Sequence, residues 1–314
     1  MVTTKEHKFI SVVARVRNDR ERVKPFLDTV MGACAALFEK CELIFVDDAS
    51  TDGTVDEIRA YYEASPADYM VSIVKLGISQ GLESAMNAGR DLAIGDFVFE
   101  FDDLIVDYDT DMIRQAYESC IAGHDIVEVS SDAPMRWTSR LFYRIYNSAS
   151  RTRIPVEQTT FRLLTRRAVN RVKSLGVHIP YRKAVYLNCG LSVQRLRYHA
   201  SGKGVTVHSV GEGRTELATD SFIYFTNVME KVALIITSVF FFIALAVAVY
   251  VIVSIFTDDQ MASGWVSMMG FLSLAFMGVF GLLAIMLKYL SVIVNLVFRR
   301  QRYLIEDIEK IKGN

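Results

Sequence analysis

The sequence carries no excess of either charge, no paired cysteines and no apolar leader. Its 314 residues hold 35 basic and 36 acidic side chains, a formal net charge of −1, which excludes a polycation that grips nucleic acid by neutralising phosphates. The four cysteines show no spacing typical of a zinc or redox site. Residues 1–13 lack the long apolar stretch of a signal peptide, so we expect the first domain to stay in the cytosol. A hydrophobic fraction of 51% excludes a disordered chain.

Two long runs without any charged side chain lie in the last third of the sequence. Residues 232–256 and 264–287 are each about 24 residues long, enough to cross about 30 Å of hydrocarbon as helices. Basic residues flank the outer ends of the pair, whereas the connecting loop contains Asp258 and Asp259. By the positive-inside rule we expect a multi-pass protein of the cytoplasmic (inner) membrane, with both termini in the cytoplasm.

The first 130 residues alternate between two periodicities. Short apolar runs bounded by turn residues predict strands at 9–16, 42–48, 69–76, 96–101 and 125–130. Amphipathic spacing predicts helices at 21–40, 54–64, 81–93 and 109–122. Strands that alternate with helices imply an α/β fold with a mostly parallel, Rossmann-like sheet covered on both faces. In such sheets ligands bind beyond the carboxyl ends of the strands.

Carboxylates gather at two of these strand ends, in residues 47–54 and 100–103. Such clusters suit a hard divalent cation and the base or ribose of a nucleotide, although Asp, Ser, Thr and Gly are also ordinary turn residues. The third loop, 76–89, lacks both a GxGxxG fingerprint and a Walker lysine. Hydride transfer and ATP hydrolysis therefore lose their main support.

The segments ISVVARVRND (10–19), IFVDDASTDGT (44–54), SQGLESAMNAGRDLAIGD (79–96) and EFDD (100–103) resemble glycosyltransferase family 2, which implies a GT-A fold. Later segments, at 140–144, 154–155, 160–163, 218–226 and 299–306, resemble the polyprenyl-phosphate glycosyltransferases within that family. This group contains dolichyl-phosphate mannose synthase and bacterial relatives with two membrane helices.

Four parts are predicted from these patterns together. They are a cytoplasmic GT-A catalytic domain at 1–215, an interfacial amphipathic segment at 216–231, two transmembrane helices with a short outer loop at 232–298, and a cytoplasmic basic tail at 299–314. Gly270, Gly278 and Gly281 in the second apolar run are compatible with close helix contact, and hence with a homo-oligomer.

The resemblance also implies a role for particular residues. Nucleotide-binding roles fall on Arg15, Asp19, Asp47, Asp48, Ser79 and Gly81. Mg²⁺ or Mn²⁺ would be held by Asp102 with Glu100 and Asp103. The acceptor phosphate would be met by Arg140, Arg144 and Arg162, and direct catalytic roles fall on Asp103, Glu157 and Arg162.

Several positions depart from the family pattern, and three of them bear most directly on activity. Glu100 stands where the first Asp of the metal motif is expected, Ser79 where Asn is common, and Thr160 where Asp usually precedes Phe-Arg-Leu. A missing carboxylate at 160 is tolerable if the acceptor is a phosphate monoester, which is already largely dianionic at neutral pH. A sugar hydroxyl would need a general base, and Asp103 or Glu157 could act as one.

We therefore expect an inverting, metal-dependent hexosyltransferase of cell-envelope polysaccharide biosynthesis. It would move a sugar from a nucleotide diphosphate, UDP favoured, to a polyprenyl (undecaprenyl or dolichyl) phosphate at the cytoplasmic face, with no nucleic acid as partner. One alternative is a family 2 transferase that acts on a lipid-linked or surface-polysaccharide hydroxyl. A second alternative is an inactive GT-A binding or scaffold protein.

Overall fold

The computed structural model describes residues 5–65, 68–133, 154–174, 182–200 and 303–311, together with isolated residues within 140–148 and 235–293. The chain divides into two compact units, one made of residues 1–147, 152–217 and 301–314, the other of 148–151 and 218–300. Among the described residues, no helix is both long and apolar enough to span a bilayer. The predicted interfacial segment 216–231 and most of the predicted spans lie outside the described residues.

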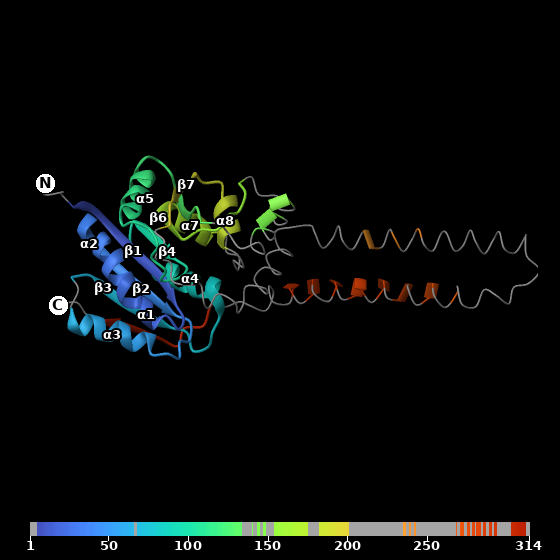
Figure 1. The fold of residues 1–314 in the computed structure, drawn as a ribbon, viewed down its shortest axis with the longest axis horizontal. Coiled ribbons are helices and arrows are strands. Elements are labelled where there is room, and N and C mark those ends of the chain that lie inside the picture. The colour runs from blue at the N-terminus through green and yellow to red at the C-terminus, as the bar shows by residue number, and fades with distance from the viewer. Residues whose placement is uncertain are drawn as a thin grey trace, which may run out of the picture. The chain divides into compact units, whose positions relative to one another are not determined.

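An eight-stranded mixed sheet forms the centre of the first unit (Figure 1). Its strands are β1 (Glu6–Val16), β2 (Phe38–Asp47), β3 (Met70–Lys75), β4 (Phe97–Phe101), β5 (Ile126–Ser131), β6 (Phe161–Thr165), β7 (Val193–Tyr198) and β8 (Asp307–Ile311). They are arranged in the order β7-β5-β6-β4-β1-β2-β3-β8. Only β6 and β8 run antiparallel to their neighbours in this sheet. The predicted mostly parallel α/β sheet is thus confirmed.

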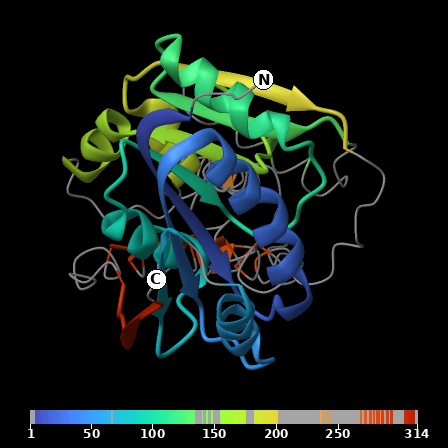
Figure 2. The ribbon, with the colours of Figure 1, turned by 90° about the vertical axis from the view of Figure 1, so that its left-hand side faces the viewer.

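Helices cover both faces of the sheet. They are α1 (Arg20–Phe26), a π-helical turn η1 (Leu27–Met31), α2 (Gly32–Leu37), α3 (Thr54–Ala64), α4 (Gly81–Leu92), α5 (Asp111–Ile121), α7 (Arg166–Ser174) and α8 (Arg182–Asn188). One core cluster joins the sheet to α1, η1, α2, α3 and α5, and Figure 2 shows α1 and α2, in blue, lying across the strands. The other core cluster joins the opposite face to α4, α7 and α8.

Helix α4 packs unusually close to the sheet, which fixes the position of the loop before it. A Cβ added at Gly89 would lie 2.4 Å from Cγ1 of Val13 and 2.8 Å from Cγ2 of Val46. Because a side chain does not fit there, the helix backbone rests directly on β1 and β2. The first turn of α4 is thereby held at the carboxyl ends of these strands, where the predicted site residues lie.

Candidate active site

Asp48, which follows β2, joins the ends of three neighbouring parallel strands. Its side chain is fully buried. Arg15 of β1 donates from Nε and Nη2 to Oδ2 of Asp48, at 3.2 and 2.7 Å. The Ser79 hydroxyl donates to the same oxygen at 3.3 Å, and the backbone N–H groups of Gln80 and Gly81 donate to Oδ1 at 2.6 and 3.3 Å. Four of the residues predicted to bind the nucleotide therefore meet at one carboxylate.

Asp19 and Asp47 each stabilise a turn at the same edge of the sheet. Asp19 accepts a hydrogen bond from the backbone N–H of Arg17 at 3.0 Å and from Nη1 of Arg22 at 2.8 Å. Oδ1 of Asp47 accepts from the backbone N–H of Ser50 at 3.0 Å. Both carboxylates are buried, so each holds a loop in shape at the place where the sequence predicts a nucleotide.

Two non-glycine residues in these loops have left-handed backbone conformations. Asn18 has φ of 55° and Ala49 has φ of 59°. Within the described parts of the chain no other non-glycine residue has a positive φ. Oδ1 of Asn18 accepts from the backbone N–H of Thr51 at 2.8 Å, which ties the two loops together. Backbone strain of this kind concentrates at ligand-binding sites, because the surroundings must enforce it.

Asp102 and Asp103 follow β4 and differ in their electrostatic surroundings. Burial raises the pKa of Asp103 to about 6, and the nearby carboxylates of Asp102 and Asp19 act in the same direction, while a hydrogen bond from the backbone N–H of Ile105 opposes them. Burial would also raise the pKa of Asp102, but the guanidinium groups of Arg162 and Arg182 hold it well below its usual value. Asp19, Asp102 and Asp103 thus form one acidic neighbourhood.

Arg182, the first residue of α8, ties the end of β4 to α4. Its guanidinium donates to Glu83, Glu100 and Asp102, each at 2.7 Å. Glu100 is fully buried, and its second oxygen accepts from the Tyr186 hydroxyl at 2.7 Å. Both carboxylate oxygens of Glu100 are therefore engaged. Its predicted role as a metal ligand stays a prediction, but in this structure Glu100 anchors α8.

A row of alternating charges crosses the sheet beside this anchor. Glu100 of β4, Arg162 of β6, Glu128 of β5 and Arg195 of β7 are paired in register on adjacent strands. Arg162 is 1% exposed and lies 3.6 to 3.8 Å from Glu100, Asp102 and Glu128. Burial works against its charge, but these carboxylates raise the pKa of Arg162 above its usual value.

The remaining predicted residues lie farther along this network or outside it. Glu157 pairs with Arg195 at 3.3 Å and with Arg197 at 3.1 Å, so it belongs to the β7 side of the row. Arg140 and Arg144 are exposed, in a stretch that is described only in part. Among the residues that the structure describes, Glu157, Arg140 and Arg144 form no hydrogen bond or ion pair with Asp102 or Asp103.

Sequence reasoning missed Arg182, although it contacts three of the acidic side chains at this edge. Two buried carboxylates, Glu83 and Glu100, and the half-buried Asp102 require a cation nearby, but the sequence does not say which of its 35 basic residues supplies it. Within the described residues, no three His, Cys, Asp or Glu side chains form a group that could hold a metal ion. The carboxylates at the end of β4 therefore do not form a preformed group of three metal ligands, and the buried Arg162 and Arg182 balance part of their charge.

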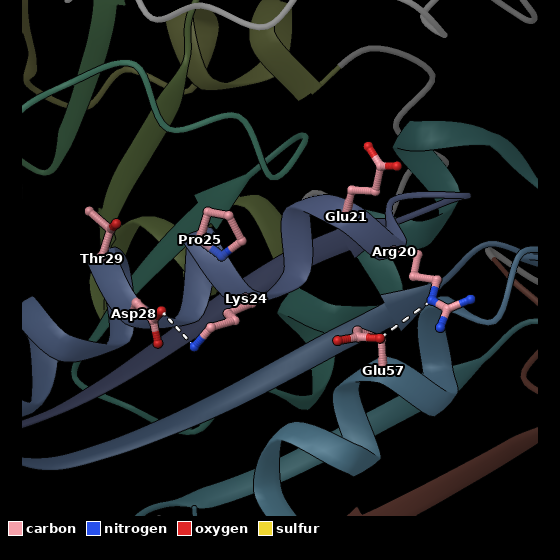
Figure 3. A pocket seen from close by; sticks show the side chains of 7 residues that line it. All are labelled: Arg20, Glu21, Lys24, Pro25, Asp28, Thr29 and Glu57. Atoms are coloured by element: carbon pink, nitrogen blue, oxygen red, sulfur yellow. Dashed lines mark hydrogen bonds and ion pairs between the residues drawn. The ribbon is translucent and has the colours of Figure 1, made fainter. Parts of the chain in front are cut away.

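A separate hollow of about 830 Å³ lies between α1, η1 and α3 (Figure 3). It is lined by Arg20, Glu21, Lys24, Pro25, Asp28, Thr29 and Glu57. Four of its five charged side chains form ion pairs, because Arg20 pairs with Glu57 at 3.4 Å and Lys24 with Asp28 at 3.2 Å. None of the predicted site residues lines this hollow.

Comparison with known proteins identifies the family. Residues 11–173 match the family model "Glycosyl transferase family 2". An uncharacterized glycosyltransferase of Synechocystis is 23% identical over 95% of both chains. The bactoprenol glucosyl transferase of Shigella phage SfV is 31% identical over 53% of this chain and 55% of its own length. An undecaprenyl-phosphate 4-deoxy-4-formamido-L-arabinose transferase of Serratia proteamaculans is 29% identical over 45% of this chain and 42% of its own.

Among solved structures, the mannosyltransferase PcManGT from Pyrobaculum calidifontis, in complex with GDP-Man and Mn²⁺, is similar over 94% of this chain and 89% of its own. The TM-score is 0.49 and the identity 15%. This chain spans only about half the length of the bactoprenol relatives. The family model, in contrast, covers more than half of this chain, including the strand ends just described. Because the family model matches more than half of its length, the chain belongs to glycosyl transferase family 2.

Proposed function

We propose that the protein transfers a sugar from a nucleotide diphosphate sugar to a polyprenyl phosphate at the cytoplasmic face of the inner membrane. Family membership supports a glycosyl transfer, and two relatives are named for bactoprenol and undecaprenyl-phosphate substrates. The uncharged runs 232–256 and 264–287 support a membrane anchor. With the catalytic unit held at the bilayer, a lipid acceptor would be found by diffusion in two dimensions.

The observation that carries the proposal is the edge of the sheet where Asp102 and Asp103 lie beside Arg162 and Arg182. Transfer from a nucleotide sugar leaves a diphosphate whose charge must be stabilised as the glycosidic bond breaks. Buried guanidinium groups, held by the carboxylates around them, are fixed cations of the kind that does this without reorganising. The edge also lies next to Asp48 and the residues that donate to it, Arg15, Ser79, Gln80 and Gly81, which we assign to the nucleotide.

The carboxylates of this edge fit a divalent cation as a pair. Mg²⁺ is commonly bound by one or two carboxylates, with substrate phosphates and water completing its coordination. Asp103 is partly exposed and acidic groups surround it, whereas Glu100 is sealed between Arg182 and Tyr186. We therefore assign Asp103 and Asp102 to Mg²⁺ or Mn²⁺, which when bound would neutralise the departing diphosphate.

Thr160 favours a phosphate acceptor over a sugar hydroxyl. Its hydroxyl lies 2.8 Å from that of Tyr198 and is no general base. A polyprenyl phosphate needs none, because its oxygen is already ionised at neutral pH. Direct displacement at the anomeric carbon then inverts its configuration. Arg162 would stabilise the acceptor phosphate electrostatically, with Arg140 and Arg144 as its exposed partners.

The test uses the full chain in vesicles that contain undecaprenyl phosphate. Each of a panel of radiolabelled nucleotide sugars is added with Mn²⁺, and the extracted lipid is separated by chromatography. We expect one donor, UDP-linked, to give a labelled lipid that mild acid cleaves, as a glycosyl phosphate requires. Asp102→Asn should abolish the label and Asp111→Asn, an exposed carboxylate on α5, should not. No labelled lipid with any donor would refute the proposal.

Two other functions predict different results in the same assay. A transferase that uses a hydroxyl acceptor would label no lipid in these vesicles, which offer only undecaprenyl phosphate, but would bind UDP in calorimetry with a dependence on Mn²⁺. An inactive binding protein is favoured by one observation, the engagement of Glu100 and Asp102 by Arg182. It would bind UDP in calorimetry without any dependence on Mn²⁺ and would label no lipid.

A further inference from the structure

The C-terminal segment 303–311 is bonded to the loop that surrounds Asp48. The side-chain amide of Gln80 pairs with the backbone of Leu304: Nε2 donates to the Leu304 carbonyl at 2.7 Å, and Oε1 accepts from the Leu304 N–H at 2.8 Å. The backbone N–H of the same Gln80 donates to Oδ1 of Asp48 at 2.6 Å. One residue therefore links the C-terminal segment to the carboxylate assigned to the nucleotide.

The rest of the segment is anchored on both sides of this loop. Strand β8 pairs antiparallel with β3, the strand that precedes the loop, and appears in red at that edge of the sheet in Figure 2. The backbone N–H of Glu306 donates to the carbonyl of Lys75 at 2.9 Å. On the other side, the hydroxyl of Tyr303 donates to Asp91 of α4, the helix that follows the loop, at 3.1 Å.

The loop itself has few anchors of its own. Residues 77–79 are exposed, and the only buried side chain between β3 and α4 is that of Leu76. Exposed segments with few buried contacts open locally at low free-energy cost. Hydrogen bonds to Asp48 on one side and to Leu304 on the other therefore determine where the loop rests.

We propose that residues 303–311 act as a strap that holds loop 76–81 in its nucleotide-binding position, with Gln80 as the positioning residue through which the strap acts. The inference rests on the proposed function in one respect, namely that the ligand of this loop is a nucleotide. The strap sets the orientation of the Gln80 and Gly81 N–H groups toward Asp48. A loosened strap would let the loop and Asp48 separate, so the nucleotide would bind less tightly while the chemical step stays the same.

The test compares Gln80→Ala, Leu304→Pro, which removes the donating N–H, and the double variant. Hydrogen exchange of the full chain follows the amides of Gln80 and Gly81, and calorimetry measures UDP affinity with Mn²⁺. Two hydrogen bonds of ordinary strength predict about tenfold faster amide exchange, an about tenfold higher dissociation constant and KM for the nucleotide sugar, and an unchanged kcat. Leu304→Pro removes only one of the two hydrogen bonds that Gln80→Ala removes, so its effects should be smaller, and the double variant should be no worse than Gln80→Ala alone.

Gln115→Ala is the matched control, because the side-chain amide of Gln115 donates to Asp111 on the exposed face of α5, outside the strap and the loop. Unchanged exchange at Gln80 and Gly81 in both single variants would overturn the strap. Additive effects in the double variant would overturn the assignment to Gln80. Faster exchange in a protein whose unaltered form binds no UDP would support the strap and refute the proposed nucleotide site, so the two failures are distinguishable.

Discussion

Nη1 of Arg182 lies 2.7 Å from Oε2 of Glu100, and both side chains are buried. The pair joins α8 to β4 at the strand end where the predicted metal motif begins. Because Glu83 and Asp102 share the same guanidinium, the arginine lies between helix α4, strand β4 and the loop that follows β4. The acidic edge of the sheet is therefore positioned by a cation that comes from a distant part of the sequence.

Arg182→Ala should destabilise the protein by about 3–5 kcal/mol, because removing one partner of a buried ion pair leaves uncompensated charges. Transfer activity should fall with it, since Asp102 loses its closest cation. Thermal unfolding of the full chain measures the stability change. Arg167→Ala serves as the control, because Arg167 is 74% exposed and lies 3.7 Å from Asp125, so its loss should cost under about 0.5 kcal/mol. Equal effects of the two substitutions would contradict the central role of Arg182.

Glu100→Gln separates a structural role from metal binding. The amide keeps the shape of the side chain but removes the charge that balances Arg182. If Glu100 anchors α8 and binds no metal, Glu100→Gln should lower the melting temperature and leave the Mn²⁺ concentration for half-maximal activity unchanged. Asp103→Asn should instead raise that concentration. A higher Mn²⁺ requirement in Glu100→Gln at unchanged stability would restore Glu100 as a metal ligand.

Asp103 should make activity depend on pH near 6. In the metal-free protein its carboxyl is neutral below the raised pKa of about 6 and charged above it. Protons therefore compete with Mn²⁺ for this side chain, so Mn²⁺ binding, and transfer with it, should decline as the pH falls through 6. The folded state bears a penalty for this charge that begins above the usual value of 3.8 and is complete above 6. Asp103→Asn keeps an oxygen for the N–H of Ile105, so it should raise the melting temperature by several °C at pH 7.5 and leave it unchanged at pH 3.5.

The exposed carboxylate of Asp111 provides the control for that experiment. Hydrogen bonds from Gln115 and Arg114 lower its pKa, so Asp111→Asn should not stabilise the protein at neutral pH. A pH profile that is flat between 5 and 7, together with unchanged stability of Asp103→Asn, would count against the acidic neighbourhood around Asp103.

Gly89→Ala should destabilise the fold, because the new methyl group would clash with Val13 and Val46. Overpacking of this kind typically costs about 1–3 kcal/mol. Gly32→Ala on α2 is a matched control, since a Cβ at Gly32 meets no atom within 4 Å and its φ of −58° is helical. This second substitution should stabilise by about 0.4–1 kcal/mol. Chemical denaturation of both variants measures the difference, and equal stabilities would show that α4 can move away from the sheet.

The periodicity of the sequence predicted those helices and strands whose formation depends on local patterning. The strand at 9–16 and the helix at 54–64 match β1 and α3 closely. β1 is a short, continuously buried apolar run, as expected of a central parallel strand, and α3 buries Thr54, Ile58 and Tyr62 at helical spacing. The predicted helix 21–40 is instead divided by η1 and gives way to β2 at Phe38. There the β2 register with β1 overrides helical propensity, which no local pattern reveals.

Contacts between distant segments were beyond the reach of the sequence. Residues 299–314 were expected to form a basic tail, and β8 within them is short and only partly apolar. Its place beside β3 depends on Glu309, which meets Arg59 of α3 across 250 positions of the chain. The role of Arg182 could not be predicted for the same reason, because its partners Glu83, Glu100 and Asp102 lie at least 80 positions away in the sequence. The carboxylates at 47–48 and 102–103 could be predicted because parallel strands bring their carboxyl ends to one edge.

Glu309 should make the docking of β8 sensitive to strong acid. Hydrogen bonds from Arg59 and Lys75 lower its pKa to about 2, against a usual value of 4.5. A lowered carboxyl pKa stabilises the folded state fully above the unfolded value, and this contribution is lost as the pH falls through about 2. Glu309→Gln removes it at every pH, at a cost of about 1 kcal/mol for a pair that is partly exposed.

Hydrogen exchange of residues 307–311 at pH 7 measures that loss directly. The amides of β8 should exchange faster in Glu309→Gln than in the unaltered chain. Glu118→Gln, which breaks an exposed pair with Arg114 on α5, should leave β8 unchanged. The strap also includes Leu304. Looser docking of β8 should therefore weaken the contact between Leu304 and Gln80, and with it UDP binding, in the same variant. Faster exchange confined to β8, with UDP affinity intact, would mean that the contact between Gln80 and Leu304 holds without the strand.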